Sequence, residues 1–467
     1  MMKGYLSKNQ IDYVFYHFNF ILELTDDIRN RIFFVIDKEK SVSEDKTGIN
    51  IPLSSGNLIT DQIRYISGIP VLFPMSEEDR FYRIEGKQVI FTHDLIKSAF
   101  YLLSGYQEYE SKDVDEHGRF PYSSSIQKKL EITTKPIVNY YFEKLAEGIE
   151  QFCRLNNISF RRRKFFNSWG LMLTHDVDQL TTYHFFVWVY RLKILLGIVP
   201  SGWSFPQKAR VFIRYLMYML IPLSRKNLHW NFESLRRIEK RYGMDSVFYF
   251  LPKTRRDKHS FYRIDEPRVK RLVERLLQDG CEVGVHGTYE SAGDGFVLSQ
   301  LAQTMKESLN IRAFGIRQHF LKYDLPRTAW LQHNAGFKYD STLGFAEHEG
   351  FRNSYCLPFK PYDFERDCMI DIWELPLIAM DATMFRYQNF SLQEARDALG
   401  RLLDEVERFH GLFTLLWHNG PIDDLRHKQT EYLYEAILWQ LDQRQPQVIT
   451  GSQMTEKMRS STHIDGC

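Results

Sequence analysis

Several short stretches of the sequence combine side chains that could hold a metal ion and transfer protons. Asp176 and Asp178 stand two residues apart in Thr174-His175-Asp176-Val177-Asp178, and side chains spaced i and i+2 on an extended strand point to the same side. Two carboxylates held close together are unfavourable unless a cation or hydrogen bonds neutralise them. Imidazole and guanidinium groups follow at three later places: His286, Arg317 and His418. Such groups, if they converge on one point, predict a metal site with an acid–base pair.

The elements that must position these groups are strands alternating with helices from residue 168 onward. Apolar runs of strand length are expected at Gly170–Thr174, Ser246–Leu251, Cys281–Val285, Ala313–Ile316, Met369–Leu375, Phe413–Trp417 and Gln447–Thr450. Helical patterns lie between them at Glu266–Gln278, Leu298–Leu309, Thr328–Ala335, Leu392–Phe409 and Thr430–Leu441. Strands separated by helices predict an α/β fold with a parallel sheet. Seven or eight such units predict that the sheet closes into a distorted (β/α) barrel. Functional side chains of such barrels lie at the C-terminal ends of strands, where the four groups above are expected.

Composition narrows the class of protein. The chain has 467 residues, of which 43% are hydrophobic and 26% charged, and this balance excludes intrinsic disorder. A net charge of +2 gives no electrostatic basis for general nucleic-acid binding. The five cysteines show no C-x-x-C spacing, so neither a disulfide framework nor a zinc ribbon is indicated, and a cytoplasmic setting is expected. We expect no secretory signal, because the first residues carry no apolar run that leads to a small-residue cleavage site. We expect no membrane-spanning helix, because no apolar run reaches 18 residues.

Two domains are expected, with one insertion. Residues 1–160 mix strand patterns with helical ones and predict a smaller α+β domain, and the basic stretch Arg161–Lys164 reads as a solvated linker. The barrel should span residues 168–455. Residues 183–225 form a long aromatic and apolar segment with interspersed Lys and Arg, which is either a helical insertion packing on the barrel or a basic amphipathic surface on a membrane interface.

The order and content of the strand-end groups resemble those of the polysaccharide deacetylase family, carbohydrate esterase family 4, over residues of about 168–455. The resemblance implies that Asp176 is the catalytic base and Asp178 a metal ligand. It implies that His286 is a further ligand and that Arg317 pairs with the base carboxylate. Leu416-Trp417-His418 resembles the last motif of the family, which implies that His418 is the general acid.

The sequence departs from the family pattern at two positions. Glu290 stands where the family has a second histidine, four residues after His286, and carboxylate oxygen can also bind zinc. His319 replaces the proline of the third motif and could supply the missing ligand instead. Both alternatives stay open at this stage, as does a metal-free barrel that has lost activity.

Other residues are expected to contact substrate or to shape the site. Asp340 belongs to a stretch that resembles the fourth motif, and the residues after it resemble a divergent subgroup with an additional, uncharacterised N-terminal domain. Substrate contacts are expected from Asp340, Trp417, His348 and Arg352, and stacking on sugar rings from Phe320 and Trp373 as well. Asp115, His117 and Arg119 are interpreted as a structural or interdomain turn.

The resemblance implies a metal-dependent hydrolase that removes acetyl groups, most of all N-acetyl groups, from a carbohydrate of cell-surface polysaccharide metabolism. The expected cofactor is a divalent metal ion, and zinc is the preferred candidate. The substrate could be lipid-linked, with the enzyme peripheral at the inner membrane face. Two alternatives are a catalytically inactive glycan-binding barrel and a membrane-surface component of polysaccharide assembly.

Overall fold

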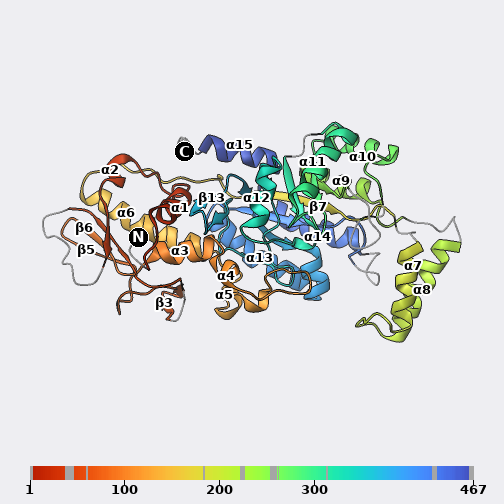
Figure 1. Cartoon of the computed structure of the whole chain (residues 1–467), viewed down its shortest axis with the longest axis horizontal. Coiled ribbons are helices and arrows are strands. Elements are labelled where there is room, and N and C mark those ends of the chain that lie inside the picture. Colours follow the sequence, from red (N-terminus) through yellow and green to blue (C-terminus); the bar gives the residue numbers. More distant parts are fainter. Residues whose placement is uncertain are drawn as a thin grey trace.

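The computed structural model of the chain describes residues 4–36, 47–58, 62–181, 185–220, 227–252, 260, 262–311, 314–422 and 429–461. Three parts follow one another along the long axis of the molecule (Figure 1). An α+β part contains the N-terminus, a parallel-sheet part lies in the middle, and a pair of helices projects at the far end. The middle part carries the strand-end groups identified in the sequence.

The central sheet is built from parallel strands. Its strands are β7 (Gly170–Val177), β8 (Ser246–Phe250), β9 (Glu282–Gly287), β10 (Gly315–Gln318), β11 (Tyr339–Asp340), β14 (Trp373–Glu374), β15 (Leu377–Met380), β16 (Leu412–Leu416) and β17 (Gln447–Val448). The order is β14-β11-β10-β9-β8-β7-β16-β15, with β17 beside β7. Only Leu375 and Pro376 separate the two edge strands, β14 and β15, so the sheet curves until its edges come together. The expected distorted (β/α) barrel is confirmed.

The strands form because their sequences are apolar on both faces. All eight residues of β7 and all five of β8 are buried, as expected for parallel strands covered on both sides. Gly284 in β9 lies against a neighbouring ring: a Cβ atom there would meet Tyr249 at 2.7 Å. The glycine therefore lets the aromatic side chain of β8 fill the barrel interior.

Helices cover the outside of the sheet. They are α9 (Phe232–Arg241), α10 (Pro267–Gln278), α11 (Gly295–Leu309), α12 (Arg327–Asn334), α13 (Leu392–Arg408), α14 (Thr430–Asp442) and α15 (Gly451–Ser461). The start of α13 is fixed by a capping box, in which Ser391 and Glu394 bond each other's backbone N–H groups. Its apolar positions, such as Leu399, Leu402 and Val406, are buried against the sheet side. The five helices predicted within the barrel all form, with ends shifted by at most three residues.

One predicted strand is wrong. The run Met369–Leu375 divides into β13 (Cys368–Met369) and β14, and β13 pairs antiparallel with β12 (Tyr362–Asp363) outside the barrel. The barrel strand β15 was not predicted, since it is only four residues long and follows Pro376 directly. Residue 313, at the start of another predicted strand, lies outside the described residues.

The N-terminal part has its own sheet of order β1-β2-β6-β5. The strands of the N-terminal part are β1 (Ile32–Ile36), β2 (Ile49–Leu53), β3 (Arg64–Ile66), β4 (Ile69–Val71), β5 (Tyr82–Glu85) and β6 (Gln88–Phe91), of which β3 and β4 form a separate pair. Its helices are α1 (Lys8–Phe18), α2 (Asp26–Arg29), α3 (Leu95–Leu103), α4 (Tyr106–Glu110), α5 (Ile126–Lys129) and α6 (Ile137–Leu155). Arg162, expected in a solvated linker, instead forms ion pairs with Glu143 and Glu150 of α6. The hydrophobic core is continuous with that of the barrel.

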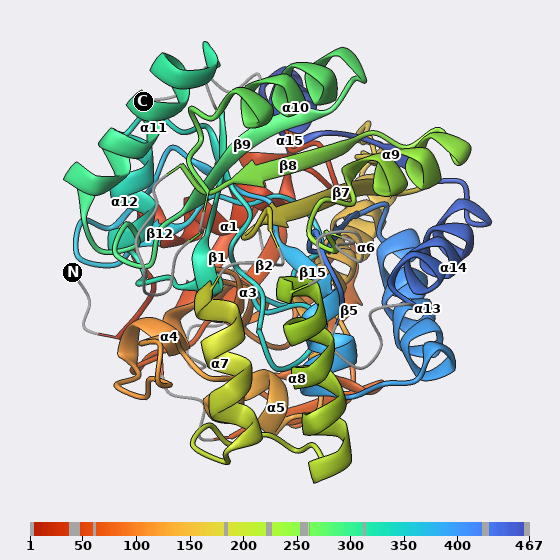
Figure 2. The same cartoon turned by 90° about the vertical axis from the view of Figure 1, so that its right-hand side faces the viewer.

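The segment expected as a helical insertion forms a hairpin of α7 (Phe185–Leu195) and α8 (Phe205–Leu220). Its expected ends, 183–184 and 221–225, lie outside the described residues. Ile194, Val211 and Tyr215 are buried between the two helices. The hairpin extends away from the barrel in Figure 1, and Figure 2 shows it in front of the barrel part. Among the described helices, none combines the length and the apolar character that crossing a bilayer requires.

Candidate metal centre

Parallel pairing brings the four strand ends to one edge of the barrel. Arg317 of β10 is the register partner of His286 on β9, and Asp176 is near the end of β7. His418 lies two residues after β16, which pairs with β7 on its other side. A cavity of about 290 Å³ at this edge is lined by Asp176, Asp178, His286, His319 and His418 together with loop residues.

Three side chains form a ligand set. Asp178 Oδ1 lies 3.3 Å from His286 Nε2 and 3.5 Å from His319 Nε2. All three residues offer ligand atoms within 4.8 Å of one another. In a tetrahedral zinc site with ligand distances of about 2.0–2.1 Å, neighbouring ligand atoms lie about 3.3–3.4 Å apart. The spacing therefore suits one ion with an open fourth position.

The protonation pattern also favours a cation at this point. His286 Nδ1 lies 3.0 Å from the carbonyl oxygen of Arg317, which can only accept a hydrogen bond, so Nδ1 carries a proton. In the neutral imidazole, Nε2 then directs a lone pair toward Asp178. Asp178 Oδ1 is buried and accepts no hydrogen bond within the described residues. Two lone-pair atoms that face each other are stabilised by a metal ion between them, and the backbone bond on Nδ1 fixes the imidazole in this orientation.

Electrostatics keep Asp178 ionised. Burial acts to raise the pKa of this carboxyl, but His319, His286 and His418, whenever their imidazoles carry a positive charge in the metal-free site, hold the pKa well below its usual range. A carboxylate that is charged at every physiological pH is available as a metal ligand. His286 and His319 themselves lie with ring centroids 4.9 Å apart.

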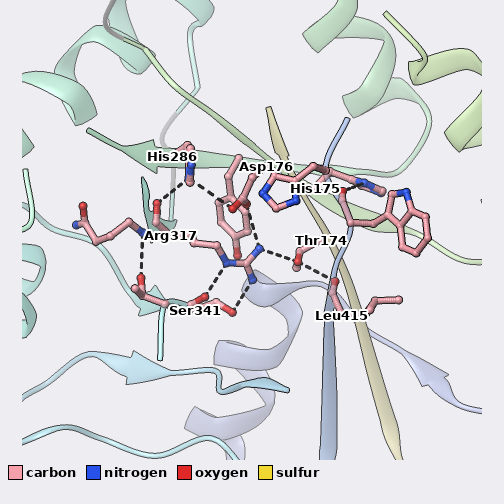
Figure 3. Close-up of polar contacts among 12 residues, drawn as sticks. Thr174, His175, Asp176, His286, Arg317, Ser341 and Leu415 are labelled. Carbon is pink, nitrogen blue, oxygen red and sulfur yellow. Dashed lines mark hydrogen bonds and ion pairs between the residues drawn. The ribbon is translucent and has the colours of Figure 1, made fainter. Parts of the chain in front are cut away.

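Asp176 is held by a buried arginine (Figure 3). Arg317 Nη1 donates to Asp176 Oδ1 at 3.1 Å and to Thr174 Oγ1 at 2.7 Å. Its Nε and Nη2 donate to the backbone oxygen and the hydroxyl of Ser341 at 2.7 Å and 2.9 Å. Arg317 is fully buried and Asp176 is 2% exposed. Because Nε, Nη1 and Nη2 of Arg317 all donate hydrogen bonds, the guanidinium is held in place. Arg317 therefore fixes Oδ1 of Asp176 and leaves Oδ2 to accept a proton.

His418 is supported by a residue that the sequence reasoning missed. Asp381 follows β15 and accepts two hydrogen bonds from His418: one from Nδ1 at 2.7 Å and one from the backbone N–H at 3.0 Å. Burial lowers the pKa of His418, but the carboxylates of Asp381, Asp178 and Asp176 outweigh this and raise it to about 9. His418 Nε2 lies 3.9 Å from Asp178 Oδ2, so a protonated imidazole points into the cavity.

Glu290 does not join the ligand set. It is exposed in the turn after β9, and the cluster that could hold a metal contains His319 in its place. The backbone explains why His319 can reach the site: His319 begins a short turn directly after β10, followed by Phe320 at φ 61°. The structure thus favours one of the two alternatives that the sequence left open.

Four expected substrate contacts are misplaced. Trp417 and Trp373 are 1% and 6% exposed, packed against Tyr434 and Phe20 respectively, so neither ring can stack on a sugar. Asp340 is 1% exposed, and its carboxylate accepts a hydrogen bond from Thr342 within the core. Arg352 is buried in an ion pair with Glu108 of the N-terminal part.

One further expected substrate contact, His348, lies elsewhere. His348 stacks on Tyr122, with ring centroids 4.6 Å apart, and does not line the cavity. Arg119 lies in the expected interdomain turn, where its Nε donates to Asp115 and its Nη1 donates to the carbonyl of Phe320 at 2.7 Å, and it also lines the cavity. The side chain of Phe320 is beside it in the cavity wall. The N-terminal part therefore helps to shape the metal centre.

Comparison with known proteins gives a family match for the N-terminal part alone. Residues 5–154 match a family of unknown function (DUF7033). No curated protein matches the whole chain or a part of it.

Several solved structures are similar to this chain over 61–63% of its length. A protein from Mycobacterium smegmatis assigned as a polysaccharide deacetylase is 16% identical, with a TM-score of 0.40, over 63% of this chain and 91% of that one. A family 4 carbohydrate esterase from Streptomyces lividans is 10% identical, with a TM-score of 0.30, over 61% and 93%. A CE4 family pseudoenzyme from Bacillus anthracis is 8% identical, with a TM-score of 0.32, over 62% and 66%.

Proposed function

We propose that this protein is a metal-dependent hydrolase that removes acetyl groups from a carbohydrate, N-acetyl groups above all. The observation that carries the proposal is that Asp176, held by Arg317, and His418, held by Asp381, line the same cavity as the ligand set. Asp176 Oδ2 lies 3.9 Å from His286 Nδ1, and His418 Nε2 lies 3.9 Å from Asp178 Oδ2. Hydrolysis of an acyl group needs both a base and an acid at one reacting carbon.

The metal has a defined place in this proposal. Asp178, His286 and His319 would hold it, and two imidazoles with one carboxylate form a set that zinc uses in catalytic sites. A bound divalent ion supplies Lewis-acid chemistry, acidifying a water molecule and polarising the acyl oxygen.

Asp176 takes the proton of the attacking water at Oδ2, since Arg317 occupies Oδ1. Arg317 also keeps the carboxylate ionised, because a cation at hydrogen-bond distance favours the charged form. The water oxygen bonds to the carbonyl carbon, and the bond from that carbon to the sugar nitrogen breaks. His418 delivers a proton from Nε2 to the departing nitrogen while Nδ1 stays bonded to Asp381. The products are acetate and an amine.

We propose an amide substrate rather than an ester because of the general acid, His418. An amine is a poor leaving group until it is protonated, whereas an ester alcohol leaves more readily. The half-buried imidazole of His418, with the Asp381 carboxylate behind it and a pKa of about 9, carries its proton at neutral pH. This arrangement suits the harder of the two bonds.

The test is acetate release from soluble N-acetylglucosamine oligomers by the full chain, before and after dialysis against a chelator. Asp176→Asn and His418→Ala should each lower turnover by about 10²–10⁴-fold. The matched variants Asp397→Asn, at an exposed residue, and His333→Ala, at a partly exposed one, lie outside the site and should retain full activity. Unchanged acetate release by either site variant contradicts the assigned roles. A protein that binds zinc and oligosaccharide but releases no acetate contradicts the proposed hydrolysis and favours the glycan-binding alternative.

A further inference from the structure

The outer surface of the α7–α8 hairpin is apolar where a water-soluble helix pair is usually polar. Leu196, Ile198 and Phe205, in and beside the turn between the two helices, are 64%, 66% and 69% exposed. Such large apolar side chains normally avoid water, and clustered exposed apolar residues mark an interaction surface. The end of the hairpin therefore needs a partner that the described chain does not supply.

The same surface continues along α8. Ile213, Met217 and Leu220 are exposed and spaced i, i+4 and i+7, which places them on one face of the helix. The opposite face carries Val211 and Tyr215, which are buried against α7. Helix α8 thus carries buried apolar side chains on one face and large exposed apolar side chains on the other.

Charge distinguishes among the partners that could cover this surface. Residues 185–220 contain five basic residues and no Asp or Glu, while the whole chain has a net charge of only +2. The rest of the chain is therefore net negative, and positive charge is concentrated on the hairpin. Lys193 and Arg210 are exposed beside the apolar side chains. Apolar side chains interspersed with Lys and Arg complement a bilayer surface that contains anionic headgroups.

The length of the helices decides how they would meet a bilayer. The 16 residues of α8 extend about 24 Å, which is shorter than the hydrocarbon thickness of about 30 Å. The hairpin cannot cross, but its apolar face can lie at the boundary between headgroups and acyl chains.

A large cavity connects the hairpin to the metal centre. Its volume is about 1220 Å³, and Asp178 and His418 line it on the barrel side. Tyr190, Arg191 and Trp203 line it on the hairpin side. A substrate that emerges from a bilayer beside the hairpin would enter this cavity and reach the catalytic groups without leaving the membrane surface.

We propose that the exposed face of α7 and α8 docks on a bilayer containing anionic lipid and so presents the metal centre to acetylated glycans that are anchored in the membrane. The docking stands on the hairpin alone, whereas the choice of substrate rests on the proposed deacetylase function.

Flotation of the full chain with vesicles tests the docking. Vesicles of phosphatidylcholine mixed with phosphatidylglycerol should carry the protein upward in a density gradient, and vesicles of phosphatidylcholine alone should carry much less. The hairpin variant, which combines Leu196→Ser, Ile198→Ser and Phe205→Ser, should lower the partition coefficient between vesicles and water at least about tenfold. Lys193→Gln with Arg210→Gln should lower it about 30-fold at low salt and less at high salt.

The control variant replaces three exposed aromatic residues outside the hairpin by serine: Phe296→Ser, Tyr65→Ser and Tyr432→Ser. It should float like the unchanged protein. Thermal unfolding of each variant shows that the fold is kept. Equal flotation of the hairpin variant and the control overturns the docking, as does equal binding to both kinds of vesicle. Concentration-dependent dimerisation that the hairpin variant abolishes, without vesicle binding, would instead assign this face to a second copy of the chain.

A second measurement separates docking from chemistry. Acetate release is compared for a soluble N-acetylglucosamine oligomer and for the same sugar attached to a lipid in anionic vesicles. The hairpin variant should keep the rate on the soluble substrate within about twofold and lose at least about tenfold on the vesicle-bound one. Loss of both rates overturns the selective role of the hairpin, and an equal rate on the vesicle substrate overturns its role in substrate delivery. Absence of any acetate release by the unchanged protein contradicts the proposed function but leaves the flotation result standing.

Discussion

Asp381 Oδ1 and His418 Nδ1 lie 2.7 Å apart, although 37 residues separate them in the sequence. The two residues follow the neighbouring parallel strands β15 and β16, whose carboxyl ends meet at the barrel edge. The same aspartate also accepts the backbone N–H of His418 at 3.0 Å, so it fixes the ring orientation as well as the charge. Burial raises the pKa of Asp381, but the protonated His418 outweighs this effect and lowers it. Each partner therefore keeps the other ionised.

Asp381→Asn should shift the pH profile of the enzyme. The amide accepts a hydrogen bond but carries no charge, so the pKa of His418 should fall from about 9 toward its ordinary value. A general acid works only while it is protonated, so the alkaline limb of kcat/KM moves to lower pH and the maximum drops about 10²-fold. The profile of acetate release against pH measures both. An unchanged alkaline limb would show that His418 is not the acid.

His319→Ala should release the metal, whereas Glu290→Gln should not. His319 Nε2 lies 3.5 Å from Asp178 Oδ1 inside the ligand set, while Glu290 is exposed. Removing one of three protein ligands should weaken zinc binding by more than about 100-fold, because loss of even an outer-shell partner costs 10–100-fold. Competition with a zinc-binding dye measures the affinity of both variants. The assignment of the third ligand is wrong if Glu290→Gln loses zinc and His319→Ala keeps it.

Much of the site followed from the sequence because parallel strands end at one edge. Asp176, His286, Arg317 and His418 stand at such ends, and a small error in strand length does not move them away. Strand ends alone could not decide between Glu290 and His319, since side-chain direction in a turn depends on backbone angles. The turn at Phe320, with φ 61°, is one that the sequence does not predict.

The misplaced residues have a different cause. Trp417 lies next to His418, but successive side chains of an extended segment point to opposite sides, so the neighbour of a site residue is directed into the core. Arg352 pairs with Glu108, which is 244 positions away. Contacts between two such distant parts leave no local pattern, and the same holds for Arg119 at the cavity wall. Asp381 was missed because the short strand before it was missed.

Arg317→Met should strongly destabilise the metal-free protein. Its fully buried guanidinium bonds Asp176, Thr174 and Ser341, and removing it leaves the buried Asp176 carboxylate uncompensated. The free energy of unfolding should fall by about 3–5 kcal/mol. Urea denaturation in the presence of a chelator measures this loss.

Two variants accompany that measurement. Arg401→Met, on the exposed face of α13, should change the stability by less than about 0.5 kcal/mol. Asp176→Asn combined with Arg317→Met should recover part of the loss, because the uncompensated charge is gone. A single-variant loss no larger than that of Arg401→Met would mean that the buried pair contributes nothing to the fold.

His17 should make the stability of the whole chain sensitive to acid. This buried side chain of α1 donates from Nδ1 to Tyr13 O at 2.9 Å and accepts the backbone N–H of Lys360 at Nε2, so it must be neutral. Burial lowers its pKa from 6.5 to about 3. Below pH 6.5 the unfolded chain binds a proton that the folded chain does not, so this contribution to stability is present above pH 6.5 and is lost as the pH falls toward 3. The loss is about 1.4 kcal/mol per pH unit within that window. Urea denaturation between pH 7.5 and pH 5 is compared for the unchanged protein, His17→Gln and the partly exposed control His333→Gln. Only His17→Gln should show a shallower decline of stability with falling pH, and equal slopes in all three would exclude His17 as the source.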